Sequence, residues 1–270
     1  MKKLICFICL VVTCLTVTGC FGKRDENTLI VGASSTPHAD ILRFIEQDFE
    51  SFGYKLEIKV YNDYVLPNTA LASGDLDANF FQHLPYLQNY NAEHKTNLIS
   101  ACAVHYEPMG IFGKNLSSLS ALPAKAKILI PTDGSNQTRA LLLLAENNVI
   151  TLKSGANINT EVTPNDIAND NGYNIIPVEA ATIPAQLNYS ENGSIAVING
   201  NYALSAGFSI SSALAIESSN GASAITYANI LAIKSGDENR EAIKKLVELL
   251  TSEKTKQFIT NNYNGAVLPV

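Results

Sequence analysis

The feature that most constrains the fold is a regular alternation of short apolar strands and amphipathic helices along nearly the whole chain. Residues 28–33 form an apolar run, residues 39–52 carry apolar side chains at helical spacing, and residues 55–61 alternate strictly between polar and apolar. Recurrence every third or fourth position predicts a helix, whereas strict alternation predicts a half-buried strand. Strands separated by helices predict parallel sheets that are covered on both faces.

The same alternation continues to the C-terminus. We expect a polar, Asn-rich surface loop at 154–172, because that stretch lacks any regular apolar period. Further strands are expected at 75–81, 98–106, 127–131, 174–178, 194–198 and 229–234, and helices at 67–73, 85–94, 137–148, 183–188 and, as a pair, within 240–259.

So many strands favour two lobes over one large sheet. The composition shifts near residues 107–122, which are rich in Gly, Ser and Pro, and we expect the chain to cross there to a second lobe. A return crossover is expected near residues 226–230. The sequence thus predicts an α/β protein in which each lobe is a sheet flanked by helices. Residues 28–109 with 227–270 form lobe 1, and residues 110–226 form lobe 2.

Composition excludes several classes of protein. Of the 270 residues, 46% are hydrophobic and only 16% are charged, which is too apolar for a disordered chain. The formal net charge of −6, without a basic run past residue 24, argues against a nucleic-acid surface. Five cysteines and four histidines do not suit a disulfide scaffold and leave little room for a metal cluster.

The N-terminus has the pattern of a secretory signal. Lys2 and Lys3 precede an apolar stretch at 4–17, and small residues follow it before Cys20. That stretch is too short for a confident membrane span, which needs about 20 residues. The Val-Thr-Gly-Cys sequence resembles the lipobox of bacterial lipoproteins. It implies a signal peptide at 1–19, a lipid on Cys20 and a polar tether over 20–27. A plainly cleaved signal or a short anchor is the alternative.

The segment 74–87 (GDLDANFFQHLPYL) gathers aromatic and imidazole side chains at the end of a predicted strand. Strand alternation places Phe81 and His83 on one face, and Tyr86 follows closely. Such groups at the carboxyl end of a strand are typical of a pocket wall. The competing interpretation is that the phenylalanines are core residues and His83 is structural.

The segment 131–144 (PTDGSNQTRALLLL) places Arg139 in the expected first turn of a helix. A helix start favours anions, and a guanidinium adds a bidentate clamp for a carboxylate. A solvated or ion-paired arginine remains the alternative. Asn201 and Asn229 each stand at the edge of an apolar strand, where an amide offers both a donor and an acceptor. Turn or cap chemistry is the alternative for Asn201.

These segments, in this order, resemble the NlpA/MetQ family of lipoproteins, the substrate-binding components of methionine-type ABC importers. The resemblance runs from Val31 to the C-terminal Asn-Gly-Ala-Val-Leu-Pro. It implies a two-lobed, type II periplasmic-binding-protein-like fold with an amino acid in the cleft. It also implies a protein anchored by lipid on the extracytoplasmic face of a bacterial membrane. The implied partners are L-methionine or a related amino acid, a permease and, indirectly, its ATPase. No cofactor, metal, catalytic residue or nucleic acid is implied.

The resemblance also implies a ligand site. Arg139 would hold the α-carboxylate, and Asn201 and Asn229 the amino-acid backbone. His105 and Tyr106 precede Glu-Pro-Met-Gly, where the family has a cleft-facing aromatic residue, and we include His105 in the site while leaving this choice open. The side-chain pocket would be lined by Tyr64, Phe81, His83 and Tyr86.

Other functions stay open at this point. The same fold could bind a dipeptide or another apolar amino acid, or act as an adhesin without a ligand. A metal-binding receptor is suggested by His83, His94 and His105, which are spaced by eleven residues. Eleven is not a ligand spacing within one helix, which weakens this interpretation. An enzyme is disfavoured because no Gly-x-Ser-x-Gly elbow, paired carboxylates or phosphate loop stands out.

Overall fold

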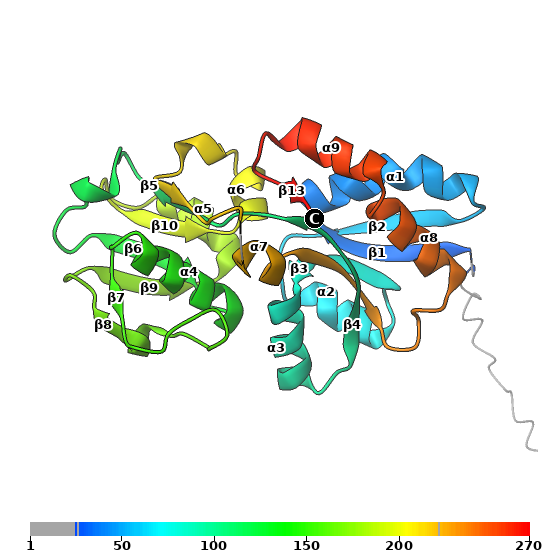
Figure 1. Ribbon diagram of the computed structural model, residues 1–270, viewed down its shortest axis with the longest axis horizontal. Coiled ribbons are helices and arrows are strands. Elements are labelled where there is room, and N and C mark those ends of the chain that lie inside the picture. Colours follow the sequence, from blue (N-terminus) through cyan, green and yellow to red (C-terminus); the bar gives the residue numbers. More distant parts are fainter. Residues whose placement is uncertain (1–24, 26, 221) are drawn as a thin grey trace, which may run out of the picture.

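The chain folds into two lobes, each built on its own β-sheet (Figure 1). The computed structural model describes residues 25, 27–220 and 222–270, so the predicted signal peptide and Cys20 lie outside the described residues. The first sheet has the strand order β13-β4-β12-β3-β1-β2, and the second has the order β11-β5-β10-β6-β9. The predicted two-lobed α/β architecture is therefore confirmed.

The first lobe combines an N-terminal series of elements with four that return from the second lobe. Its elements are β1 (Thr28–Ser34), η1 (Ser35–Ala39), α1 (Asp40–Ser51), β2 (Lys55–Tyr61), α2 (Leu66–Ser73), β3 (Ala78–His83), α3 (Leu84–His94), β4 (Leu98–Tyr106), β12 (Asn229–Lys234), α8 (Glu241–Leu250), α9 (Glu253–Tyr263) and β13 (Leu268–Pro269).

The second lobe is continuous in sequence and ends in the helix α7, which leads back to β12. Its elements are β5 (Gly110–Gly113), η2 (Leu119–Ala121), β6 (Lys127–Pro131), α4 (Gly134–Glu146), β7 (Thr151–Leu152), η3 (Pro164–Asp166), β8 (Ile167–Asn169), β9 (Asn174–Val178), η4 (Ala180–Thr182), α5 (Ile183–Asn188), β10 (Ile195–Ile198), α6 (Gly200–Ser205), η5 (Ile210–Ser212), β11 (Ala215–Ile216) and α7 (Ala222–Thr226).

The sheets are mixed, which corrects the expectation of parallel sheets. β1 pairs in parallel with β2 and β3, but β12 lies between β3 and β4 and is antiparallel to both. In the second sheet, β6 is parallel to β9 and β10, whereas β5 is antiparallel to β10. The reason lies in the crossovers. β4 ends at the side of the first lobe that faces the second lobe, and β12 begins at that same side. The returning strand therefore runs opposite to β3 and β4, which end there.

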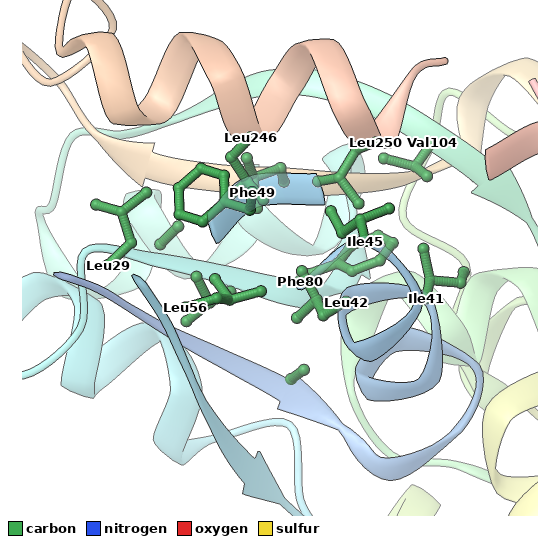
Figure 2. Packing of buried hydrophobic residues seen from close by; sticks show 14 of the residues in the cluster. Leu29, Ile41, Leu42, Ile45, Phe49, Leu56, Phe80, Val104, Leu246 and Leu250 are labelled. Carbon is green, nitrogen blue, oxygen red and sulfur yellow. The ribbon is translucent and has the colours of Figure 1, made fainter. Parts of the chain in front are cut away.

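Helices cover both faces of the first sheet. Side chains of α1, including Ile45 and Phe49, pack with Phe80 of β3 and Leu246 of α8 in one buried cluster (Figure 2). On the other face, α2 and α3 pack against β12 (Figure 1). Successive side chains of a strand point to opposite faces, so alternate residues of each strand serve the two layers. Full burial of one large apolar side chain contributes about 1.5–3 kcal/mol.

The second sheet is built in the same way. In β6, Ile128 and Ile130 belong to the cluster under α4, whereas Leu129 between them belongs to the cluster under α5. The apolar run of α4 explains its burial, since both Leu141 and Leu144 are fully covered. None of the helices in the described part of the chain is long and apolar enough to cross a membrane.

The predicted start of one helix was wrong. Helix α4 begins at Gly134 and not at 137, because the carboxylate of Asp133 accepts a hydrogen bond from the backbone N–H of Asn136 and caps an earlier first turn. Arg139 is therefore in the second turn of α4. The expected loop at 154–172 contains η3 and β8, and β8 pairs with β7 as a small hairpin-like sheet.

Candidate functional site between the two lobes

A cavity lies where the edges of the two sheets face each other. From the first lobe, the end of β3 and the residue after β4 contribute to it, and from the second lobe, α4 and the segment after β10 do so. Ligands of α/β proteins commonly bind beyond the carboxyl ends of parallel strands. The lining residues are Tyr64, Phe81, Gln82, His83, Tyr86, Glu107, Asn136, Arg139, Asn199, Gly200, Asn201 and Asn229.

The structure brings most of the sequence-predicted ligand residues to this cavity. His105 is not among the lining residues. It is fully buried behind the wall, in contact with Glu107. Tyr106 also lies outside the lining, and its hydroxyl donates to Glu217. The predicted residues that line the cavity are Tyr64, Phe81, His83, Tyr86, Arg139, Asn201 and Asn229.

Three aromatic rings form one wall of the cavity. The ring of Tyr64 lies 5.8 Å from that of Phe81 and 5.7 Å from that of Tyr86, measured between centroids. The hydroxyl of Tyr86 donates to the backbone carbonyl of Tyr64 over 3.0 Å, and the hydroxyl of Tyr64 donates to Oδ1 of Asn201. These bonds fix the rings, so the wall presents apolar faces in a set orientation.

The guanidinium of Arg139 is a positively charged group in the cavity wall, and Glu217 forms an ion pair with it. Its Nε donates to Oε1 of Glu217 over 2.7 Å, and its Nη2 donates to Oε2 of Glu217 and to the backbone carbonyl of Glu107, both over 2.6 Å. Burial alone lowers the pKa of Arg139, but Glu217 outweighs it and the pKa is raised, so the guanidinium stays charged. Neither partner uses Nη1, and the side chain is only 4% exposed.

His83 is a neutral hydrogen-bond donor. The backbone N–H of Tyr86 donates to its Nδ1 over 3.2 Å, so the proton is on Nε2, which donates to Oδ1 of Asn136 over 3.2 Å. Burial, and secondly the charge of Arg139, lower the pKa of His83 to about 3. His83 therefore contributes a dipole and a ring surface to the cavity but no charge at neutral pH.

A chain of amides fixes the polar wall of the second lobe. Asn136 donates from Nδ2 to the carboxylate of Asp133 over 2.9 Å, so its Oδ1 accepts from Nδ2 of Asn199 over 2.7 Å. Among the described residues, Oδ1 of Asn199 and Nδ2 of Asn201 are buried without a hydrogen-bond partner. An unpaired buried polar atom costs about 1–3 kcal/mol. A ligand that offers a donor to Asn199 and an acceptor to Asn201 removes this penalty.

Glu107 gives the cavity a buried carboxyl group that the sequence-based prediction missed. Its side chain is buried, and its Oε1 lies 2.7 Å from Nε2 of His105 and 3.4 Å from Nε2 of His38. Burial raises the pKa of Glu107, whereas His38 and Arg139 lower it. The sequence could have indicated this role for Glu107, because the residue directly follows the predicted strand 98–106. Side chains at the end of a strand lie at the edge of the sheet. Asn136, Asn199 and Glu217 were also missed, since only tertiary contacts reveal their roles.

Only one group of potential metal ligands occurs among the described residues. The facing atoms of His38, His105 and Glu107 lie within 4.8 Å of one another. Nε2 of His105 is hydrogen-bonded to Oε1 of Glu107, and Nε2 of His38 is hydrogen-bonded to Oδ1 of Asn229. All three side chains are buried. We therefore treat it as a hydrogen-bonded cluster. The structure does not bring together His83, His94 and His105, the set suggested by their even spacing.

The two α/β lobes are joined by two connections, and a cavity between them holds an arginine, a glutamate and an aromatic wall. This arrangement is that of a two-lobed, periplasmic-binding-protein-like protein. Within this class, the chain belongs to the NlpA lipoprotein family, which it matches over residues 29–270.

Relatives with known names or structures agree with this assignment. The methionine-binding lipoprotein MetQ of Bacillus subtilis is 38% identical over 251 residues, which cover 92% of this chain and 89% of that protein. A lipoprotein structure from Ruminococcus gnavus has a TM-score of 0.86 at 45% identity, covering 90% of this chain and 99% of that one. A nutrient-binding protein from Burkholderia cenocepacia, solved bound to methionine, has a TM-score of 0.83 at 36% identity, covering 89% and 99%.

Proposed function

We propose that this protein captures methionine, or a closely related apolar amino acid, in the interlobe cavity and delivers it to an ABC importer. The observation that carries the proposal is one cavity in which an arginine, a glutamate and two unpaired amide atoms face an aromatic wall. The names of the relatives support the same ligand, since they bind methionine.

The polar groups match a free amino acid. The α-carboxylate accepts from Nη1 of Arg139 and Nδ2 of Asn201, which the contacts with Glu217 and Tyr64 leave unused. The α-ammonium donates to the carboxylate of Glu107 and to Oδ1 of Asn199. Charge-assisted hydrogen bonds of this kind are about twice as strong as neutral ones.

The aromatic wall suits a methionine side chain. A thioether contact with an aromatic ring contributes about 0.3–1.5 kcal/mol. Tyr64, Phe81 and Tyr86 provide three rings around one space. Removal of one methylene from a ligand changes binding by only about 1–3 kcal/mol, so other apolar amino acids remain competitors. A dipeptide is the second candidate, and its extended backbone would move the ammonium away from Glu107.

We also propose where the protein is held and which protein receives its ligand. The lipid on Cys20 and the polar tether over 20–27 hold the protein at the extracytoplasmic face of the membrane, where several acyl chains anchor far better than one. The permease receives the amino acid when the lobes open. The role is binding and release, without making or breaking a covalent bond in the ligand.

Calorimetric titration with charge-blocked ligands tests the proposal. Methionine is compared with N-acetylmethionine, which lacks the ammonium, and with methionine methyl ester, which lacks the carboxylate. We expect each blocked ligand to bind at least thirtyfold more weakly, because removing one side of a buried charge pair costs about 2–5 kcal/mol. Equal binding of all three would contradict the proposal. Tighter binding of glycyl-methionine than of methionine would favour the dipeptide.

A further inference from the structure

Two buried histidines stand behind the cavity and converge on one carboxylate oxygen. His38 follows β1 and His105 is the second-last residue of β4, and neither is exposed at all. Their Nε2 atoms lie 3.4 Å and 2.7 Å from Oε1 of Glu107. Glu107 itself lines the cavity, whereas the two histidines do not. We call these three residues the histidine–glutamate cluster.

The hydrogen bonds define which nitrogen of each ring carries the proton. His38 lies with Nδ1 2.8 Å from the hydroxyl of Ser34 and with Nε2 2.9 Å from Oδ1 of Asn229. Since Oδ1 can only accept, the proton of His38 is on Nε2 and the serine hydroxyl donates to Nδ1. In His105, Nε2 donates to Glu107, and Nδ1 has no partner among the described residues. The His105 ring therefore donates to Oε1, whereas the N–H of His38 is directed at Asn229 and its Nε2 lies 3.4 Å from Oε1.

The second oxygen of Glu107 faces the other way. A Cβ added to Gly200 would lie 3.0 Å from Oε2 and 2.7 Å from Cβ of Glu107, so this carboxylate packs directly against the backbone of a cavity-lining residue. Gly200 permits this approach because it has no side chain. The backbone N–H of Asn201 also favours the ionised form of Glu107. His105 thus fixes one oxygen, and the other lies against Gly200, which lines the cavity.

We propose that His105 is a positioning residue that keeps Glu107 ionised and oriented toward the ligand's ammonium, so that acid weakens ligand capture by protonating this one carboxylate. The inference rests on the proposed function and specifies how the same site responds to pH. Hydrogen bonds donated to a carboxylate stabilise its charged form, and burial opposes them. Loss of the His105 donor lets burial prevail, and the carboxylate then takes up a proton at a higher pH.

Every charged or titratable group that faces Glu107 acts on this balance. Burial lowers the pKa of His38 to about 4 and that of His105 to about 3, so both are neutral where the protein functions. Arg139 on α4 favours the carboxylate. Tyr64 and Tyr263 are within electrostatic reach of Glu107, and burial raises the pKa of both, so both remain neutral. Glu107 is therefore the member of this group that titrates first as the pH falls.

The test is the pH profile of methionine affinity from pH 4.5 to 8. In the unaltered protein, we expect a plateau near neutral pH and a decline of about tenfold per pH unit once Glu107 protonates, as for a single proton. His105→Phe removes the donor and should shift the midpoint of the decline to higher pH. His105→Gln, whose amide N–H can reach the same oxygen, should restore it. Glu107→Gln should bind weakly with a flat profile.

Controls separate positioning from a purely structural role. His94→Phe alters an exposed histidine at the end of α3 and should leave the profile unchanged. Thermal melts show whether each variant is folded at every pH used. The inference is overturned if His105→Phe lowers affinity equally at all pH values with the same midpoint. It is also overturned if Glu107→Gln keeps the pH dependence of the unaltered protein.

A measurement without ligand distinguishes this inference from the proposed function. Nitrogen-15 NMR of the histidine rings should show His38 and His105 as neutral Nε2–H tautomers between pH 5 and 8. Protonation of either ring in that range, or an Nδ1–H tautomer, contradicts the inference even if methionine binds. Absence of methionine binding at every pH contradicts the proposed function, and the ring spectra then still decide the state of the cluster.

Discussion

Arg139 lies between two carboxyl groups, one built into the fold and one that we assign to the ligand. Glu217 engages Nε and Nη2, and the rings of Tyr227 and Tyr106 flank the guanidinium at 4.7 Å and 5.6 Å. The buried ion pair is neutral as a whole, and so is an amino-acid zwitterion. Arg139 thus contributes N–H donors whose directions are fixed by the planar guanidinium and by its contacts with Glu217. Fixed donors of this kind suit a carboxylate better than an unpaired positive charge would.

Phe81 is the residue whose role depends most on the ligand's side chain. It is 2% exposed and faces Tyr64 and Tyr86 in the cavity wall. We expect Phe81→Ala to weaken methionine binding by about tenfold or more, because ring contacts and buried area are lost. The affinity for the free amino acid alanine should fall less, because its methyl group does not reach the ring. Competition calorimetry with both amino acids measures the difference.

The control for this variant is Phe44→Ala, which removes a ring stacked on Phe258 at the surface of the first lobe. It should leave both affinities unchanged. If Phe81→Ala weakens methionine and alanine by the same factor, Phe81 supports the fold and does not contact the ligand's side chain.

At the scale of elements, the start of α4 organises the polar wall. Asp133 caps the helix through the backbone N–H of Asn136 over 3.0 Å and also holds its side-chain amide. Asp133→Ala should lower the unfolding free energy by about 1 kcal/mol through loss of the cap. It should also weaken methionine binding, because the amide of Asn136 then no longer orients Asn199. Urea unfolding and calorimetry check the two effects.

Ser252 provides a matched control for that variant. Its hydroxyl caps α9 by accepting from the backbone N–H of Thr255 over 3.3 Å, and it does not line the cavity. Ser252→Ala should lower stability by a similar amount and leave affinity unchanged. A loss of stability without any loss of affinity in Asp133→Ala would show that the cap does not organise the ligand site.

The elements with a strong period were predictable from sequence, and those held by distant contacts were not. The strict alternation at 55–61 and the apolar strand 229–234 match β2 and β12. The antiparallel direction of β12 depends on the path between lobes, which no local pattern encodes. Phe81 and His83 could be predicted because they end a strand, whereas Glu217 reaches Arg139 across 78 positions and carries no local signal.

For the whole molecule, three buried neutral histidines predict a loss of stability in acid. The folded pKa values of His38, His83 and His105, about 4, 3 and 3, lie below the unfolded value of 6.5. As the pH falls below 6.5, these histidines take up protons in the unfolded chain but stay neutral in the folded protein. The free energy of unfolding therefore declines toward pH 3–4. Glu107, with its raised pKa, acts in the opposite direction and offsets part of the decline.

The size of this effect is measurable by urea unfolding at pH 7.5 and pH 5. At pH 5, each of the three histidines should reduce the unfolding free energy by about 2 kcal/mol. His94→Gln, which alters the exposed histidine, should not change the difference between the two pH values. Equal stability at both pH values would mean that the buried rings are protonated in the folded protein.

The two lobes contribute different residues to the cavity, so we expect ligand binding and lobe closure to be coupled. Arg139 and Asn201 come from the second lobe, whereas Asn229 comes from the first. Glu217 lies between β11 and α7 and accepts from Tyr106 in the first lobe and from the backbone N–H of Met109 in the other connection. We expect residues at the two connections to absorb a hinge motion if the lobes close on a ligand.

Calorimetric titration of methionine into the unaltered protein and into Arg139→Ala tests whether this guanidinium binds the ligand's carboxylate. The double variant Arg139→Ala/Glu217→Gln repeats the test without leaving a buried carboxylate unpaired, and Arg43→Ala, at an exposed position, is the control. We predict one methionine per chain in the unaltered protein and a loss of affinity of about thirtyfold or more in both cavity variants, equivalent to about 2 kcal/mol. Unchanged affinity in a folded Arg139→Ala protein would contradict the assignment of this guanidinium to the ligand's carboxylate.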